Sequence, residues 1–244
     1  MSRVLLILGA SSDIARAVAH KFADEGWDIL LCGRNTELLA RDAVDLRLKY
    51  KVNAEACKFD ALAFESHSGF WEDLKLKPSA VVCAFGYLGE QKVNERNWSE
   101  TRKAIDTNFT GAVSILNIVA NDFEAGKSGV IIGISSVAGD RGRMSNYMYG
   151  SAKAGFTAYL SGLRSRLYKS GVRVITVKPG FVATKMTEGL DLPAVLTTTP
   201  GQVAMDIFRA YKTGKPIVYS RWYWRLIILG IIHIPEWLFQ KLKL

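Results

Sequence analysis

Three side chains of this sequence have the types and the spacing needed to protonate a carbonyl oxygen. Tyr149 precedes Lys153 by four residues, so the two side chains would lie on one face of a helix. An ammonium group so close to a phenol is expected to lower the phenol pKa and to make Tyr149 a usable acid near neutral pH. Ser136 stands thirteen residues before Tyr149 and would hydrogen-bond the same oxygen. With a glycine-bearing turn near the N-terminus, these residues predict a nucleotide-dependent carbonyl reductase.

The elements that would position these residues alternate along the chain. Short apolar runs predict about seven strands, at residues 4–8, 28–32, 55–59, 80–84, 130–135, 172–177 and 217–219, and amphipathic stretches predict helices that include residues 13–25, 37–49, 99–123 and 147–170. Continuous apolar runs indicate strands buried on both faces, hence a parallel sheet covered by helices on each side. The sequence therefore predicts a doubly wound α/β fold of the Rossmann type, with ligands outside the carboxyl ends of the strands.

Composition limits the organisation of the chain. Its 244 residues are 49% apolar and contain no linker-like segment, which favours one domain. Residues 1–220 are expected to form its nucleotide-binding and catalytic part, and residues 221–244 an apolar and basic tail. The three cysteines, Cys32, Cys57 and Cys83, form no C-x-x-C pair and suit reduced thiols in a cytosol.

Charge and the N-terminal sequence narrow the partners and the location. The net charge of +9 is dispersed and no RNA or DNA motif accompanies it, so no nucleic-acid partner is expected. The charge fits nucleotide phosphates and an anionic membrane surface better. The apolar run at residues 4–8 is too short for a signal-peptide core, which predicts a cytoplasmic protein.

The turn after the first predicted strand passes straight into a helix, where backbone N–H groups and the helix dipole can hold a phosphate. The candidate cofactor residues in this turn are Gly9, Ser11, Ser12, Asp13 and Ile14. Small residues in such a turn are common, so the turn gains weight only from the Tyr149–Lys153 pair.

The second and third predicted strands each end in a candidate for the adenosine half of a cofactor. Arg34 stands where an NAD enzyme usually places an acid, which favours NADP(H) over NAD(H). Asp60 would accept a hydrogen bond from the adenine amino group, although a surface turn aspartate is the commoner role for such a residue.

The ordered motifs resemble the short-chain dehydrogenase/reductase family over nearly the whole length. The resemblance rests on residues 108–111 (Asn-Phe-Thr-Gly), 135–139 (Ser-Ser-Val-Ala-Gly), 149–153 (Tyr-Gly-Ser-Ala-Lys) and 178–180 (Lys-Pro-Gly), and on Thr184. It implies that Lys153 bonds the nicotinamide ribose and that Asn108 holds a water linking Lys153 to solvent. It also implies cofactor contacts from Ala84, Gly86, Tyr149, Lys153, Pro179, Gly180, Val182 and Thr184. Taken singly, a helix tyrosine, a strand-end serine and a helix asparagine are more often structural, and Tyr147 has no lysine four residues later.

Two departures from the family pattern concern the cofactor. Asp13 and Ala15 stand where the family usually has glycines, and residues 83–86 read Cys-Ala-Phe-Gly in place of Asn-Asn-Ala-Gly. A carboxylate near a pyrophosphate would repel it, so Asp13 is expected to turn away and cap the helix. The acid in this turn, residues 136–141 and the tail from Trp224 resemble enzymes that reduce a decaprenylphosphoryl 2-keto pentose, a step in making the arabinose donor for cell-wall polysaccharide.

The last sixty residues carry two apolar segments. The first, after Thr184, would form a lid suited to a lipid-linked or apolar keto substrate, or would simply pack over the site; its apolar residues are Met186, Leu190, Leu192, Pro193, Val195 and Leu196. The second has an apolar core at residues 226–232, too short to span a bilayer. Tryptophans flanked by Arg221, Arg225, Lys241 and Lys243 predict peripheral contact with the inner face of the cell membrane, a subunit interface in a homo-oligomer (dimer or tetramer), or both. His233 is expected to be a core or interface residue.

The sequence leaves other functions open. A reductase of a soluble or steroid-like carbonyl would need the same catalytic residues, and a nucleotide-binding regulator would keep the fold without turnover. The intact set of Ser136, Tyr149 and Lys153 speaks against the regulator. No metal site is expected, because no His, Cys or acidic residues stand at metal-ligand spacing.

Overall fold

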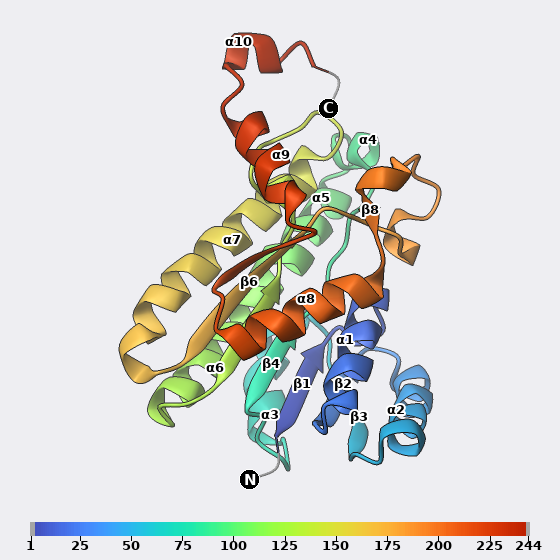
Figure 1. The fold of residues 1–244 in the computed structure, drawn as a ribbon, viewed down its shortest axis with the longest axis vertical. Coiled ribbons are helices and arrows are strands. Elements are labelled where there is room, and N and C mark those ends of the chain that lie inside the picture. The colour runs from blue at the N-terminus through green and yellow to red at the C-terminus, as the bar shows by residue number, and fades with distance from the viewer. Residues whose placement is uncertain (1–2, 243–244) are drawn as a thin grey trace.

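A seven-stranded parallel sheet runs through the centre of the molecule in this computed structural model, which describes residues 3–242 (Figure 1). The strand order is β3-β2-β1-β4-β5-β6-β9, and every neighbouring pair is parallel. The strands are β1 (Val4–Leu8), β2 (Asp28–Gly33), β3 (Ala54–Lys58), β4 (Ala80–Cys83), β5 (Val130–Ile134), β6 (Arg173–Pro179) and β9 (Ile217–Ser220). This order confirms the predicted doubly wound fold. Successive strands are added in one direction from β1 to β3 and in the other direction from β4 onward, and such folds bind ligands at the point between β1 and β4 where the strand order switches.

Side chains of each strand alternate between two apolar layers, which is why the strands read as unbroken apolar runs. Leu5 and Ile7 of β1 pack under α1 (Asp13–Asp24), α2 (Thr36–Tyr50) and α8 (Pro200–Thr213). Leu6 and Leu8 face the other layer, under α3 (His67–Glu72), α6 (Gly111–Ala125) and α7 (Tyr147–Leu167). All four leucine and isoleucine side chains are fully buried, and each stabilises the fold by about 1.5–3 kcal/mol.

The predicted helix at residues 99–123 is broken in the structure. It consists of α5 (Trp98–Ile105), a π-helical segment (Asp106–Thr110) and α6, and it follows a short α4 (Gln91–Asn94). The predicted helix at residues 147–170 ends its α-helical part at Leu167 and continues as a 3₁₀ turn (Tyr168–Ser170) that stops at Gly171, whose φ of 73° is left-handed. Further 3₁₀ turns span Phe64–Ser66, Val137–Gly139, Lys185–Thr187 and Ala194–Leu196, and β7 (Phe181–Val182) pairs with β8 (Thr197–Thr198).

The tail forms two short helices, α9 (Tyr223–Ile232) and α10 (Glu236–Phe239), which project from the same end of the molecule as α4 and β8 (Figure 1). Trp224 and Ile228 of α9 are buried against Val137 of the main body. Across residues 3–242, no helix combines the length and apolarity that a membrane span requires. His233 is exposed, so of its two expected places the core is wrong and the subunit interface stays a prediction. The chain leaves α9 there, and the His233 Nδ1 lies 2.7 Å from the Leu229 carbonyl oxygen.

Candidate active site

A cavity of about 320 Å³ opens at the carboxyl ends of β4, β5 and β6 and brings Ser136, Tyr149 and Lys153 together. Ser136 follows β5 and begins the 3₁₀ turn Val137–Gly139, where its Oγ accepts from the Ala138 N–H at 3.1 Å. Tyr149 and Lys153 lie one turn apart on α7, as their spacing predicted. Tyr147, by contrast, is exposed.

Two glycines set the separation between the serine turn and α7. A Cβ on Gly139 would come within 2.7 Å of the Lys153 backbone, and a Cβ on Gly150 would come within 2.8 Å of the Ala138 carbonyl oxygen. Any larger residue would push the turn away from the helix. The close approach keeps Ser136 within reach of Tyr149.

Burial, rather than the neighbouring ammonium, dominates the ionisation of Tyr149. Burial raises the Tyr149 pKa to about 12, against a smaller lowering by the Ser136 hydrogen bond. The expectation that Lys153 lowers the Tyr149 pKa is therefore wrong for the protein without a bound cofactor. The Lys153 Nζ lies 5.7 Å from the centre of the phenol ring and donates to the Ile134 carbonyl at 3.0 Å. Tyr149 thus keeps its proton throughout the neutral range, as a proton donor must.

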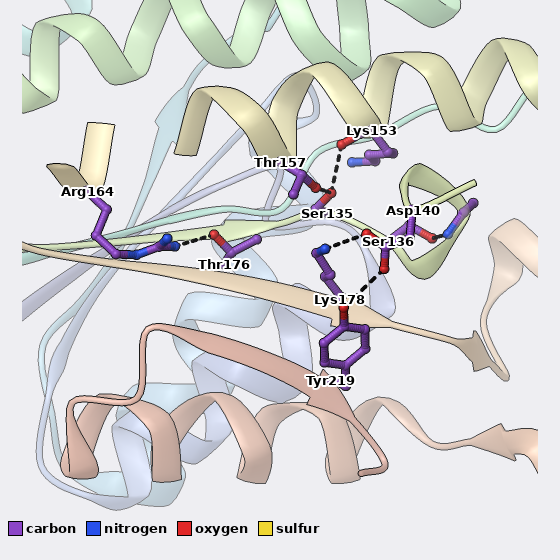
Figure 2. Close-up of polar contacts among 10 residues, drawn as sticks. Ser135, Ser136, Asp140, Lys153, Thr157, Arg164, Thr176, Lys178 and Tyr219 are labelled. Carbon is purple, nitrogen blue, oxygen red and sulfur yellow. Dashed lines mark hydrogen bonds and ion pairs between the residues drawn. The ribbon is translucent and has the colours of Figure 1, made fainter. Parts of the chain in front are cut away.

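Lys153 is held by a buried polar network on the β5 side of α7. The Ser135 Oγ donates to the Lys153 carbonyl at 3.1 Å and lies 2.7 Å from the Thr157 Oγ1 (Figure 2). Burial lowers the Lys153 pKa to about 8. The ammonium is therefore poised to exchange its proton near neutral pH.

A second buried network supports the turn after Ser136. The Lys178 Nζ, on β6, pairs with Asp140 at 2.5 Å, and the Tyr219 hydroxyl, on β9, donates to the other Asp140 oxygen at 3.2 Å (Figure 2). Both members of the ion pair are close to nine-tenths buried. They tie the end of the serine turn to the two adjacent strands.

Asn108 lies in the π-helical segment, and every side-chain bond it makes goes to a backbone group. Its Nδ2 donates to the carbonyls of Tyr87 (2.6 Å) and Ala104 (2.8 Å), and its Oδ1 accepts from the Tyr87 N–H (3.1 Å). It thereby fixes the loop after β4, where a Cβ on Gly86 would meet Asn108 Oδ1 at 3.0 Å and Lys153 Nζ at 3.6 Å. Asn108 does not line the cavity with Tyr149.

A second cavity, of about 200 Å³, continues the first toward β2 and β3. The two cavities share Ser11, Ser12, Phe85 and Gly86. Of the residues predicted to hold a cofactor, Gly9, Arg34 and Asp60 line the second, and Asp13, Ile14, Ala84, Pro179, Gly180, Val182 and Thr184 line the first with the catalytic set. Two joined cavities beside the N-terminus of α1 fit an elongated dinucleotide.

The first turn is shaped by close contact with the β4 loop. Gly9 has a φ of +81°, and a Cβ there would lie 2.6 Å from the Phe85 backbone. Ser12 caps α1 by accepting from the Ala15 N–H at 3.2 Å. Asp60 accepts from the Leu62 N–H at 3.1 Å, the turn role weighed for it above, while still lining the second cavity.

The expectation that Asp13 caps α1 is wrong, because Ser12 already fills that role. The Asp13 carboxylate instead accepts from the Lys185 backbone N–H at 2.7 Å. Asp13 thus joins the first turn to the segment after Thr184, a contact between residues far apart in the sequence that spacing does not reveal.

The apolar segment after Thr184 contributes only part of its side chains to the cavity. Met186, Leu190 and Leu192 line it. Val195 is 88% exposed and Leu196 packs against the tail helix, so the expected lid is only half formed from these residues.

Two residues that the sequence analysis did not select also line the cavity, Arg143 and Asn146. They lie in the loop between Ser136 and Tyr149, in a turn closed by the Asn146 N–H and the Arg143 carbonyl at 3.1 Å. The only sequence signal was the run of charges at residues 140–143. Within residues 3–242, no group of three acidic, histidine or cysteine side chains is arranged around a metal position.

Comparison with known proteins identifies the family. Residues 3–193 match the family model described as short chain dehydrogenase. An uncharacterized oxidoreductase of Mycobacterium tuberculosis is 33% identical over 98% of this chain and 96% of its own, and sulfoacetaldehyde reductase 2 of Chromohalobacter salexigens is 32% identical over 89% of this chain and 84% of its own. A short-chain dehydrogenase of Sphingobium yanoikuyae, solved in complex with NADPH, has the same fold, with a TM-score of 0.83 at 21% identity over 96% of this chain and 97% of its own. The chain therefore belongs to the short-chain dehydrogenase family, as its ordered motifs predicted, and is an NAD(P)-dependent oxidoreductase.

Proposed function

We propose that this protein is an NADPH-dependent ketoreductase whose substrate is a 2-keto pentose linked to a polyprenyl phosphate. The observation that carries the proposal is the single cavity in which the polar groups of Ser136 and Tyr149 face an apolar segment. The polar groups of Ser136 and Tyr149 suit a sugar ring, and the side chains of Met186, Leu190 and Leu192 suit the start of a prenyl chain.

Bound NADPH would supply a hydride to the ketone carbon. Tyr149 donates its proton to the oxygen that becomes an alkoxide, and its raised pKa keeps that proton available at neutral pH. Ser136 hydrogen-bonds the same oxygen and stabilises its growing charge. Lys153, with a pKa near 8, returns a proton toward Tyr149 after each turnover, and Asn108 holds the β4 loop beside it.

The residues that line the second cavity support a preference for NADP(H) over NAD(H). Arg34 is an exposed cation at the end of β2 and lines that cavity, so it is available to a 2'-phosphate. The structural relative from Sphingobium yanoikuyae carries NADPH, which agrees with this preference. We therefore propose NADP(H) over NAD(H).

The tail, residues 221–244, is proposed to be part of the same domain as residues 1–220 and to rest on an anionic membrane surface. Leu226, Leu229 and Ile232 are 57%, 51% and 42% exposed and lie at helical spacing on the outer face of α9. Trp222 and Trp237 of the same tail are 74% and 63% exposed, and its cations Arg221, Arg225 and Lys241 are exposed as well. Lys243 lies outside the described residues. Such a face suits the headgroup region of the cytoplasmic leaflet.

The same stripe would serve a dimer or tetramer, and the two uses are compatible. The proposed place of the enzyme is thus the inner face of the cell membrane, where a lipid-linked substrate resides.

The direct test is reduction of the lipid-linked ketone. The ketone would be made in place by an upstream oxidase acting on polyprenyl-phosphoryl ribose, and NADPH consumption would be followed at 340 nm. We expect turnover by the wild type and by Tyr147→Phe, an exposed tyrosine two residues from the proposed acid. NADPH consumption in the absence of the oxidase, or no NADPH consumption in its presence, would contradict the proposed substrate.

A small soluble carbonyl is the second candidate, because one relative is named for sulfoacetaldehyde. Activity on sulfoacetaldehyde that exceeds activity on the lipid-linked ketone would favour it. Cofactor binding without turnover of any carbonyl would instead favour a regulator.

A further inference from the structure

The strongest unexplained feature of the cavity is Arg143, a half-buried cation with two buried nitrogens that have no hydrogen-bond partner. The Nε and Nη2 atoms of Arg143 are both inaccessible and make no hydrogen bond. Of the buried polar side-chain atoms that lack a partner within residues 3–242, only those of Arg143 and Asn146 belong to residues that line this cavity. Leaving a buried donor unpaired destabilises the protein, and more so when the donor is charged, which suggests that a bound ligand pairs with these atoms.

The two free atoms of Arg143 form one edge of the guanidinium fork. Two N–H groups that point the same way match two oxygens of a carboxylate, phosphate or sulfonate. Asp140, whose charge acts on Arg143, is already engaged by Lys178 and Tyr219. Arg143 therefore has no carboxylate bonded to its fork. Burial lowers the Arg143 pKa, partly offset by the charge of Asp140, and a guanidinium in a protein stays protonated.

The other two cations that line the cavity, Lys153 and Lys185, differ from Arg143 in their surroundings. Lys153 donates to the Ile134 carbonyl beside the proposed acid, and Lys185 is an exposed residue whose backbone is held by Asp13. Asn146 lacks a hydrogen-bond donor, because its buried Oδ1 is an acceptor without a partner. An anion for Arg143 and a hydroxyl for Asn146, near Ser136 and Tyr149, describe a hydroxylated ketone that carries an acidic group.

We propose that Arg143 and Asn146 form an anion subsite that selects ketones with a phosphate-type group and a hydroxyl close to the carbonyl. The inference rests on the proposed ketoreductase function and deepens it, since a phosphodiester-linked keto sugar has both groups. The single guanidinium matches the single charge of a phosphodiester. Arg143 is a specificity residue in this scheme, not a donor to the reacting oxygen.

The test compares two ketones in Arg143→Gln, Arg143→Lys and the wild type. One ketone is a keto sugar carrying a methyl phosphodiester, and the other is the same keto sugar without it. Charge-assisted hydrogen bonds predict that Arg143→Gln lowers kcat/KM for the phosphodiester by about 10- to 150-fold relative to the neutral sugar. Arg143→Lys restores part of this ratio, because it keeps the charge but loses the fork.

Arg209→Gln is the matched control, since Arg209 is exposed on α8 and lies far along the chain from the cavity residues. It should leave the ratio at the wild-type value. A binding readout separates the subsite from catalysis: dimethyl phosphate is titrated into the NADP-bound protein by calorimetry, with methanesulfonate in a parallel arm. Wild type should bind at least tenfold more tightly than Arg143→Gln.

The outcomes distinguish this inference from the proposed function. Equal losses on both ketones in Arg143→Gln, or unchanged binding of both anions, would overturn the subsite even if the lipid-linked ketone is reduced. An Arg143-dependent preference for anionic ketones, with no turnover of the lipid-linked one, would keep the subsite and reject the polyprenyl substrate. Stronger binding of methanesulfonate than of dimethyl phosphate would overturn the choice of phosphodiester.

Discussion

Lys153→Met is expected to stabilise the protein at pH 7 while removing a residue of the active site. Burial lowers the Lys153 pKa to about 8 from its usual 10.5, so the charged lysine is disfavoured in the folded state. That difference corresponds to about 3 kcal/mol of lost stability at pH 7. Methionine has similar length, avoids this cost, and forfeits the bond to the Ile134 carbonyl, worth about 1 kcal/mol. We expect a net gain of about 2 kcal/mol.

The pH dependence gives the sharper test. Between pH 8 and 10.5 the unfolded chain retains a proton on Lys153 that the folded chain has released, so wild-type stability rises with pH across this window. The advantage of Lys153→Met should shrink there, change sign at about pH 9.5, and become a loss of about 1 kcal/mol by pH 10.5, where only the lost hydrogen bond remains. Other titrating groups are common to both proteins and cancel in the comparison.

Urea unfolding of the cofactor-free protein, monitored by tryptophan fluorescence at several pH values, would measure the difference. Lys169→Met, at an exposed lysine, is the control and should give a small, pH-independent change. A Lys153→Met protein that is less stable at pH 7, or a difference that stays constant from pH 7 to 10.5, would refute the reasoning. Either result would mean that burial does not destabilise the charged form of Lys153.

Three further predictions test the active site, the cofactor and the tail. Tyr149→Phe should lower kcat by about two to four orders of magnitude with NADPH affinity nearly unchanged, measured by steady-state kinetics and cofactor fluorescence; near-normal turnover would reject the proton donor. Arg34→Ala should weaken NADPH binding by about 10- to 150-fold and NADH binding little, with Arg41→Ala as control; equal losses would remove Arg34 from the 2'-phosphate. Deleting residues 221–244 should abolish salt-sensitive sedimentation with anionic vesicles and slow the lipid-linked substrate more than a soluble ketone. A changed sedimentation coefficient, with the intact protein ignoring vesicles, would favour a subunit interface.

Local patterns predicted the sheet well because burial on both faces leaves a simple mark in the sequence. Each predicted strand is found, with ends that differ by up to two residues. The spacing of Tyr149 and Lys153 was equally informative, since helix geometry alone places them together. Ser136 required only the further rule that strand ends meet at one edge of a parallel sheet.

The remaining features depend on contacts that spacing cannot encode. Asp13 bonds a backbone group 172 positions away, and nothing around it in the sequence indicates that partner. The π-helical break at Asn108 joins two α-helices without a glycine or proline inside it, so a helix pattern in the sequence does not reveal it. Arg143 looks like an ordinary loop cation until its burial is known. The Tyr149 pKa was mispredicted for the same reason, because desolvation is a property of the whole fold.

The loop between Ser136 and Tyr149 directs its charged side chains to three different parts of the molecule. Asp140 binds Lys178 in the sheet, and Arg143 faces the cavity. Arg141 donates to the carbonyls of Ile231 and Ile234, each at 2.7 Å, and to Glu236 at 2.8 Å, while its guanidinium lies 3.8 Å from the centre of the Phe239 ring.

The tail is thus fastened to the same loop that carries the proposed anion subsite. Gly180 also lines the cavity, and a Cβ there would lie 1.9 Å from the Trp224 indole. Trp224 in turn packs edge-on against Phe181 at 5.1 Å. A displacement of α9 or α10, whether by lipid or by a second subunit, would therefore act through direct contacts on the Arg143 loop and on Gly180, both of which line the cavity. The proposed membrane surface and the proposed substrate site are therefore structurally coupled. Replacing Arg141 with an uncharged residue should weaken both membrane binding and reduction of the substrate.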